Sequence, residues 1–160
     1  MGLLNGRLRA CSSTFNCVST SSRSADQYQG PWAVPAGVED ATAAANLLVS
    51  TLRTLYTCEV VASETLPGGQ AYRRVETQGK YALPDTLEFV VKPSPSNGDP
   101  TKVDGALIVT FRSCAGGVRF VYPFMTPLSD GGLQPERLNV LREKLGWKKV
   151  GCELAECFAG

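Results

Sequence analysis

The 160-residue sequence contains no histidine and carries almost no net charge. Histidine is the commonest general base near neutral pH and the commonest metal ligand, so its absence excludes a histidine-dependent triad and a histidine-containing zinc site. A formal net charge of +1 gives no global field that would attract nucleic acid or an anionic membrane. We therefore predict a protein that is not an enzyme, uses no cofactor or metal, and binds no nucleic acid.

Long apolar runs are also missing, because no stretch approaches the roughly 20 apolar residues that a membrane helix needs. Residues 1–10 are too short and too polar for the hydrophobic region of a secretory signal. If the protein is exported, we expect its targeting segment to lie outside this sequence. No glycine-rich segment has phosphate-loop spacing, and no pair of carboxylates stands out for hydrolysis.

Cysteine, by contrast, is abundant, with six residues of which two close pairs lie near the ends of the sequence. This pattern indicates disulfides formed in an oxidising compartment. Buried thiols in a reduced protein and a four-cysteine zinc site are the alternatives, although only the last pair has zinc-like spacing. The simplest of about fifteen full pairings is Cys11–Cys17, Cys58–Cys114 and Cys152–Cys157. Cys58 is matched with Cys114 because both lie at ends of predicted strands.

The sequence divides into an extended N-terminal arm (1–37), an α+β domain (38–147) and a C-terminal tail (148–160). The arm is rich in turn-favouring residues, and we expect Trp32 to pack it against the domain. Apolar residues at helical spacing predict a first helix over 38–56. Pro135 predicts the start of a second helix, which ends before Gly146.

Between these helices the sequence has the composition of β-strands. The predicted strands are 58–65, 71–77, 86–92, 105–113 and 118–122. Short turns join most of them, so the strands are antiparallel, and each helix has a single apolar stripe to place on one face of the sheet. The predicted fold class is α+β, an antiparallel meander of about five strands with both helices on one face. The proline-containing loop from Pro93 to Asp104 is either a mobile insertion or a partner-binding loop.

The candidate ligand-binding residues are polar side chains in and around the last strands and the second helix: Glu88, Arg112, Ser113, Asp130 and Arg137. Arg112 ends a strand row that begins apolar, and a buried arginine is usually paired. Glu88, Asp130 or Glu136 can supply the partner in a structural ion pair. The alternative is an anion or carboxylate pocket built from Arg112 and Arg137.

Several motifs resemble a family known as domain of unknown function one-four-nine-nine. Residues 11–19 are similar to that family's C-P-x-S-P-N-C-V-S-S opening. Residues 86–89, 111–113 and 129–132 are similar to its D-x-x-E-F segment, its R-S strand and its S-D-x-G turn, in the same order. Residues 122–124 (Tyr-Pro-Phe) are similar to the version in plant and algal members.

This resemblance implies an envelope protein in bacteria and, in photosynthetic eukaryotes, a plastid protein of the thylakoid lumen. It implies no particular activity. We therefore expect a soluble, non-catalytic accessory subunit that docks on a membrane-embedded photosynthetic complex, a photosystem or its antenna. One alternative is a module that binds a lipid, pigment or anion in an apolar cavity with Arg112 at its mouth. Another is an enzyme that uses Cys114 or Asp130 with Arg112.

Overall fold

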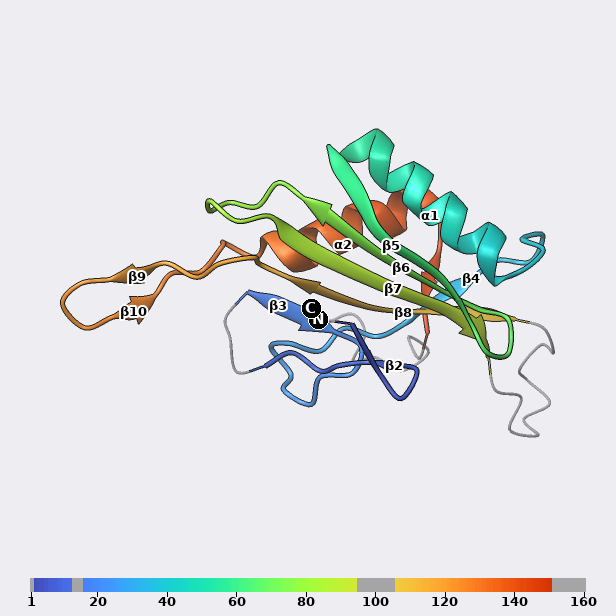
Figure 1. The fold of residues 1–160 in the computed structure, drawn as a ribbon, viewed down its shortest axis with the longest axis horizontal. Coiled ribbons are helices and arrows are strands. Elements are labelled where there is room, and N and C mark those ends of the chain that lie inside the picture. The colour runs from blue at the N-terminus through green and yellow to red at the C-terminus, as the bar shows by residue number, and fades with distance from the viewer. Residues whose placement is uncertain (1, 13–15, 95–105, 151–160) are drawn as a thin grey trace.

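The computed structural model describes residues 2–12, 16–94 and 106–150 as a twisted antiparallel sheet with both helices on one face (Figure 1). The helices are α1 (Ala41–Leu55) and α2 (Leu133–Leu145). The strands are β1 (Leu3–Leu4), β2 (Arg7–Leu8), β3 (Cys17–Ser19), β4 (Trp32–Val34), β5 (Cys58–Leu66), β6 (Gln70–Thr77), β7 (Asp85–Pro93), β8 (Leu107–Cys114), β9 (Phe120–Val121), β10 (Thr126–Pro127) and β11 (Lys148–Lys149). Most of the Pro93–Asp104 loop, together with Cys152 and Cys157, lies outside the described residues.

The predicted meander is confirmed, since β5, β6, β7 and β8 pair in sequence order and each pair is antiparallel. The connections from β5 to β6 and from β6 to β7 are short, which is why these neighbours along the chain become neighbours in the sheet, whereas β7 and β8 pair across a longer connection. Both helices were predicted at nearly their observed bounds. The α+β fold class is therefore confirmed.

The far edge of β8 is completed by segments that we expected to form an arm and a tail. β3 pairs with one end of β8 and β4 with the other, so these two short strands lie end to end along one edge. β11 then pairs with β4 and extends the sheet again. The main sheet of the described chain consequently has seven strands rather than about five.

The main core lies between the sheet and the helices and is built around two tryptophans. Trp32 and Trp147 are both almost completely buried. The Trp32 ring packs against the rings of Phe111 and Phe89, with centroids 4.6 and 6.4 Å apart. Such tilted aromatic contacts bury large apolar areas, which explains why the N-terminal segment is held against the domain, as expected for Trp32.

The opposite face of the sheet is covered by the N-terminal residues, which lie below it in Figure 1. Leu8 packs there against Tyr72 and Val90 in a second, smaller apolar cluster. Because side chains alternate along a strand, this face receives the residues of β7 and β8 that do not point at the helices. The fold therefore has three layers: helices, sheet and N-terminal segment.

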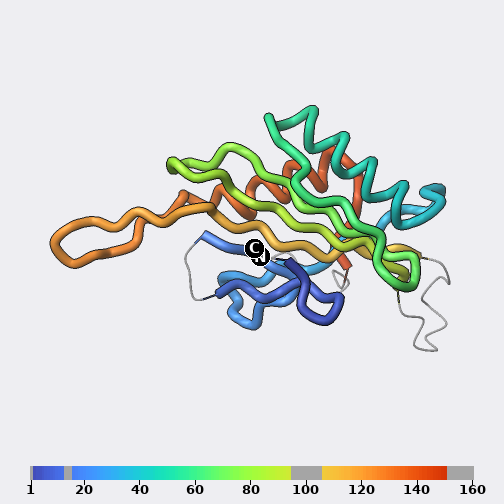
Figure 2. Tube along the Cα trace, viewed as in Figure 1, coloured from blue at the N-terminus to red at the C-terminus, as the bar shows by residue number. Residues whose placement is uncertain are grey.

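The prediction that residues 118–122 form a strand of the main sheet is wrong. Instead β9 pairs only with β10, Val121 opposite Thr126 and Phe120 opposite Pro127. This two-stranded hairpin extends well beyond the body of the molecule (Figure 2). Its alternating apolar sequence resembles that of a core strand, but both strands of the hairpin are exposed along most of their length.

Candidate functional site

The five predicted site residues do not converge on one pocket, because the sheet separates them into two groups. Arg112 and Ser113 are consecutive in β8, so their side chains point to opposite faces. Arg112 meets Glu88 beneath the N-terminal segment, whereas Ser113 faces α2, which carries Arg137. The anticipated pocket shared by Arg112 and Arg137 is therefore not formed.

The first group is centred on Glu88, whose side chain is fully buried. Glu88 and Arg112 face each other across β7 and β8, and both Nε and Nη2 of Arg112 donate to Glu88 Oε2. Its other oxygen, Oε1, accepts from the Tyr72 hydroxyl and from the Gly2 backbone N–H, each at 2.7 Å. The contact with Gly2 ties the N-terminal segment to the sheet. Of the three predicted partners for Arg112, Glu88 is therefore the one that pairs with it.

Tyr72 is electrostatically perturbed by this arrangement. Burial raises the pKa of its phenol above the ordinary value, and the hydrogen bond to Glu88 and the negative charge of Glu88 raise this pKa further. The neutral phenol is the form that can donate to the carboxylate. The protonated state of Tyr72 is therefore part of the folded structure.

The second group is a buried polar network that joins the start of α2 to the ends of β7 and β8. Gln134 is fully buried, and its side-chain amide donates to Asp85 Oδ2 at 2.8 Å and to Asp130 Oδ2 at 3.1 Å. Its carbonyl oxygen accepts from the Ser113 hydroxyl at 2.6 Å. Arg137 forms an ion pair with Asp85 at 3.1 Å. Gln134, Asp85 and Arg137 are each held by several partners, which favours a positioning role for the network.

Asp130 also organises the start of α2. Its Oδ1 accepts from the backbone N–H groups of Gly132 and Leu133, at 3.0 and 3.2 Å. The first N–H groups of a helix lack partners within the helix, so a carboxylate at this position stabilises the helix start. The predicted S-D-x-G turn is thus a structural element that holds α2 in place.

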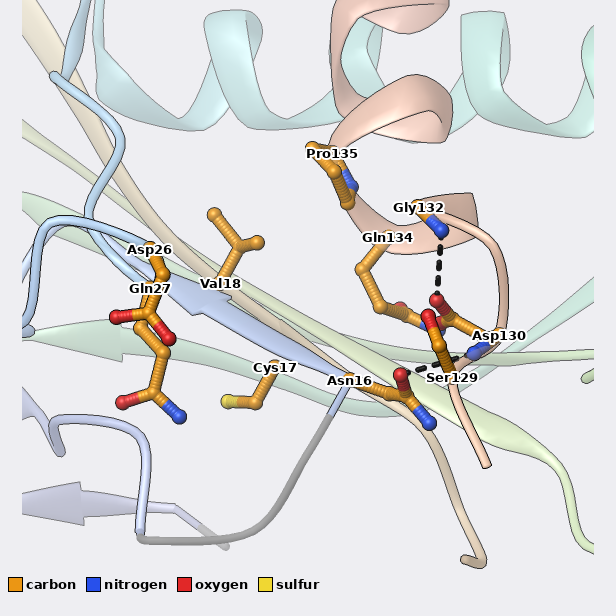
Figure 3. Close-up of a pocket in the computed structure, with 10 residues that line it drawn as sticks. All are labelled: Asn16, Cys17, Val18, Asp26, Gln27, Ser129, Asp130, Gly132, Gln134 and Pro135. Carbon is orange, nitrogen blue, oxygen red and sulfur yellow. Dashed lines mark hydrogen bonds between the residues drawn. The ribbon is translucent and has the colours of Figure 1, made fainter. Parts of the chain in front are cut away.

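A hollow of about 260 Å³ lies beside this network, between the start of β3 and the start of α2 (Figure 3). Its lining residues are Asn16, Cys17, Val18, Asp26, Gln27, Ser129, Asp130, Gly132, Gln134 and Pro135. No lysine or arginine is among them, so the hollow does not suit an anion. Its volume is also below the roughly 300–1,000 Å³ of typical small-molecule pockets.

The predicted disulfide between Cys58 and Cys114 is wrong. Cys58 begins β5 and Cys114 ends β8, and although both lie at one end of the sheet, β6 and β7 separate them. Three strand spacings amount to about 14 Å, whereas the Cα atoms of a disulfide lie within about 7 Å. Cys58 has a free thiol, and burial raises its pKa, partly offset by the positive charge of Arg53.

Cys114 instead lies near Cys17 and Cys11. The predicted partners Cys11 and Cys17 lie within disulfide distance, with their Cα atoms 5.8 Å apart, and Cys114 lies equally within reach of Cys17, with the Cα atoms 4.2 Å apart. The sequence reasoning missed this third neighbour because it treated the N-terminal arm as separate from the sheet.

The most exposed apolar surface of the described residues belongs to the β9–β10 hairpin. Tyr122 and Phe124 in its turn have exposed fractions of 86% and 88%. Phe120, Val121, Met125 and Leu128 are also exposed. The sequence from Phe120 to Leu128 contains no charged residue. An isolated two-stranded hairpin is only marginally stable in water, so this surface is unusual for a free protein.

The base of the hairpin is attached to the body by specific contacts. The Asn16 side-chain amide donates to the Leu128 carbonyl at 3.1 Å, and its oxygen accepts from the Asp130 N–H at 2.9 Å. The Tyr81 hydroxyl donates to the Ser129 carbonyl, and the Arg119 guanidinium lies 5.6 Å from the centre of the Tyr81 ring. These contacts set the direction in which the hairpin leaves the body.

Sequence reasoning missed three members of the buried networks: Tyr72, Asp85 and Gln134. Of the three, only Asp85 could have been identified as a candidate from the sequence, because it is a carboxylate that immediately precedes an apolar strand. A tyrosine and a glutamine in amphipathic elements carry no comparable signal, because both residue types are common on exposed faces.

The fold and its surfaces thus define a small α+β protein with two buried polar networks and one projecting apolar hairpin. Its sequence is similar to the thylakoid lumenal 17.9 kDa protein, chloroplastic, of Arabidopsis thaliana, at 33% identity over 147 residues. The matched region covers 91% of this chain and 58% of that relative, so the chain spans a little more than half of the relative's length. This similarity bears out the predicted location in the thylakoid lumen of the plastid.

No family model matches the chain, so the resemblance to domain of unknown function one-four-nine-nine is not confirmed. No solved structure matches it either. Neither helix of the described residues combines the length and apolar character that crossing a membrane requires.

Proposed function

We propose that this chain is a non-catalytic accessory protein of the thylakoid lumen and that its β9–β10 hairpin docks on a membrane-embedded photosynthetic complex, a photosystem or its antenna. The observation that carries the proposal is the exposure of Tyr122 and Phe124 at the end of a projecting hairpin. Aromatic residues and methionine are enriched at protein interfaces, where a few buried anchors supply most of the binding energy.

The chemistry of the hairpin favours a protein groove as its binding site. No charged side chain from Phe120 to Leu128 would lose its hydration if the hairpin entered an apolar groove. Arg119 at its base is the first charged residue that a partner's polar rim would meet, and it is anchored over Tyr81. This division into an apolar centre and a polar rim is typical of stable interfaces.

The buried networks favour a non-catalytic role. Glu88 and Arg112 bind each other, and Asp85 binds Arg137, so these charged groups are engaged in holding the layers together. The similarity to a thylakoid lumenal protein supplies the compartment in which a photosynthetic complex would be met.

The test is affinity purification of the tagged chain from detergent-solubilised thylakoids. The double variant Tyr122→Ser/Phe124→Ser should lower recovery of complex subunits about tenfold or more, because interface anchors contribute about 2 kcal/mol each. Leu47→Ser is the matched control, since Leu47 is also exposed but lies on α1, and it should leave recovery unchanged.

Two results would contradict the proposal. One is recovery of the wild-type chain only as a free monomer. The other is binding of the chain to protein-free vesicles of thylakoid lipid as strongly as to whole thylakoids, which would make the lipid surface the partner.

A further inference from the structure

Three cysteine sulfurs gather at the end of β8, on the sheet face covered by the N-terminal segment. The Sγ atoms of Cys11, Cys17 and Cys114 all lie within 4.8 Å of one another. Cys17 is buried between the other two, which are half-buried. Cys17 faces Cys114 directly in the pairing of β3 with β8, and it closes a short loop with Cys11.

This arrangement gives Cys17 two possible disulfide partners. One sulfur can form only one disulfide, so pairing with Cys11 leaves the Cys114 thiol beside the bond, and pairing with Cys114 leaves the Cys11 thiol beside it. A thiolate next to a disulfide is what thiol–disulfide exchange requires, because the thiolate attacks one sulfur of the bond and displaces the other.

We propose that Cys11, Cys17 and Cys114 form an internal thiol–disulfide exchange site. In the forward step the Cys114 thiolate attacks Sγ of Cys17. The bond between Cys17 and Cys11 breaks, and Cys11 leaves as a thiolate that takes up a proton. One disulfide and one thiol are present before and after, so the step needs no oxidant or reductant. The inference does not depend on the docking function proposed above.

A metal site is the competing interpretation of the same cluster. Structural zinc takes four ligands, commonly cysteine thiolates. Among the described residues, no fourth cysteine and no carboxylate joins the three sulfurs. The cluster therefore matches exchange chemistry better than metal binding.

The two pairings have different structural consequences. The Cys11–Cys17 bond spans 6 residues and stays within the N-terminal segment, whereas the Cys17–Cys114 bond spans 97 residues and fixes that segment to β8. Asn16, which holds the base of the hairpin through Leu128 and Asp130, directly precedes Cys17. Exchange therefore alters the covalent connection next to that anchor.

The experiment isolates the two disulfide isomers of the full-length oxidised protein. Exchange is stopped at about pH 4, the isomers are separated in acid, and each is returned to about pH 8. The thiolate fraction of a thiol with a pKa near 8.5 is roughly ten-thousand-fold larger at the higher pH. We expect each isomer to relax to the same mixture at about pH 8 and to stay unchanged at about pH 4.

Alkylation of free thiols followed by tryptic mapping identifies the pairings. Cys11 and Cys17 lie in one expected tryptic peptide, residues 10–23, and Cys114 lies in another, residues 113–119. A Cys17–Cys114 bond joins these two peptides, whereas a Cys11–Cys17 bond does not. Each isomer therefore gives a distinct map, with fragmentation showing which cysteine is alkylated.

Two variants serve as static controls. Cys114→Ser should retain only the Cys11–Cys17 bond, and Cys11→Ser should retain only the Cys17–Cys114 bond, with no relaxation in either. The proposal is overturned if the wild type shows a single pairing, if isolated isomers fail to interconvert at about pH 8, if Cys11→Ser does not oxidise, or if one zinc ion per chain is found at the cluster.

Discussion

Arg112 lies directly opposite Glu88 on the neighbouring strand, and the two side chains pair where both are buried. The pair also receives Tyr72 and the backbone of Gly2, so it connects two layers of the fold. Its place under the N-terminal segment makes it a structural contact, and its removal should be measured as a loss of stability.

Arg112→Ala should lower the free energy of unfolding by about 3–5 kcal/mol, because it leaves the buried Glu88 charge without its partner. Urea denaturation measures this change. The double variant Glu88→Gln/Arg112→Met should recover much of the loss, since no uncompensated charge remains. If Arg112→Ala instead kept full stability and abolished recovery of complex subunits, Arg112 would belong to a binding site.

Asp85→Ala should destabilise the protein by a similar amount, about 3–5 kcal/mol, because Arg137 would be left buried without a carboxylate. Since Asp85 also binds Gln134, we expect amide hydrogen exchange to accelerate at the start of α2. Glu136→Gln, on an exposed site of the same helix, is the control and should change stability by less than about 0.5 kcal/mol. Equal effects of the two substitutions would show that the network does not hold α2.

The β9–β10 hairpin should be the first site of proteolysis in the described chain, because a two-stranded hairpin without further packing opens readily. Chymotrypsin should cleave after Phe124 before it cleaves in the main sheet. Tyr122 is followed by proline and should resist cleavage. Mass spectrometry of early fragments checks this order, with Phe124→Ser as the control that removes the site. Early cleavage within β5–β8 would contradict the expectation.

Stability should fall in alkaline solution because folding raises the pKa of Tyr72. The unfolded chain releases this proton near the ordinary tyrosine pKa of about 10, whereas the folded chain retains it to higher pH. The stabilising contribution is therefore complete below about pH 10 and is lost as pH rises toward the folded-state pKa. Urea denaturation across this range measures the slope.

Tyr72→Phe is the matched variant for that measurement. It should cost about 1 kcal/mol at neutral pH through the lost hydrogen bond to Glu88. It should also flatten the alkaline decline, since the titrating group is gone. An unchanged slope in this variant would mean that other groups cause the decline.

The helices and the four long strands were predictable because their signals are local. Helical spacing identified α1, and Pro135 and Gly146 marked the two ends of α2 to within about two residues. Short connections imposed antiparallel pairing on β5, β6 and β7. The alternation along β8 correctly separated Arg112 from Phe111, since it depends only on strand geometry.

The remaining features depend on contacts between distant parts of the chain. β3 and β4 each contain three residues, which is too short for a periodic signal, and their place is set by pairing with β8. The order of strands in the sheet cannot be predicted from local sequence patterns, and it is this order that places Cys58 three strand spacings from Cys114. Because α2 covers one face of the sheet, its Arg137 pairs with Asp85 on that face and not with residues on the opposite face, where Arg112 lies.

The pairing of β3 with β8, a strand much later in the sequence, also affects the order in which the protein folds. Cys17 and Cys114 face each other where β3 pairs with β8, although 97 residues separate them in the sequence. Strands β5, β6, β7 and β8, in contrast, each pair with the next strand along the chain. Nearby contacts form before distant ones because closing a long loop costs more entropy. Until the first strands arrive, β8 presents an open edge to which a second copy could add, so rapid capture of its own N-terminal strands protects each molecule from self-association.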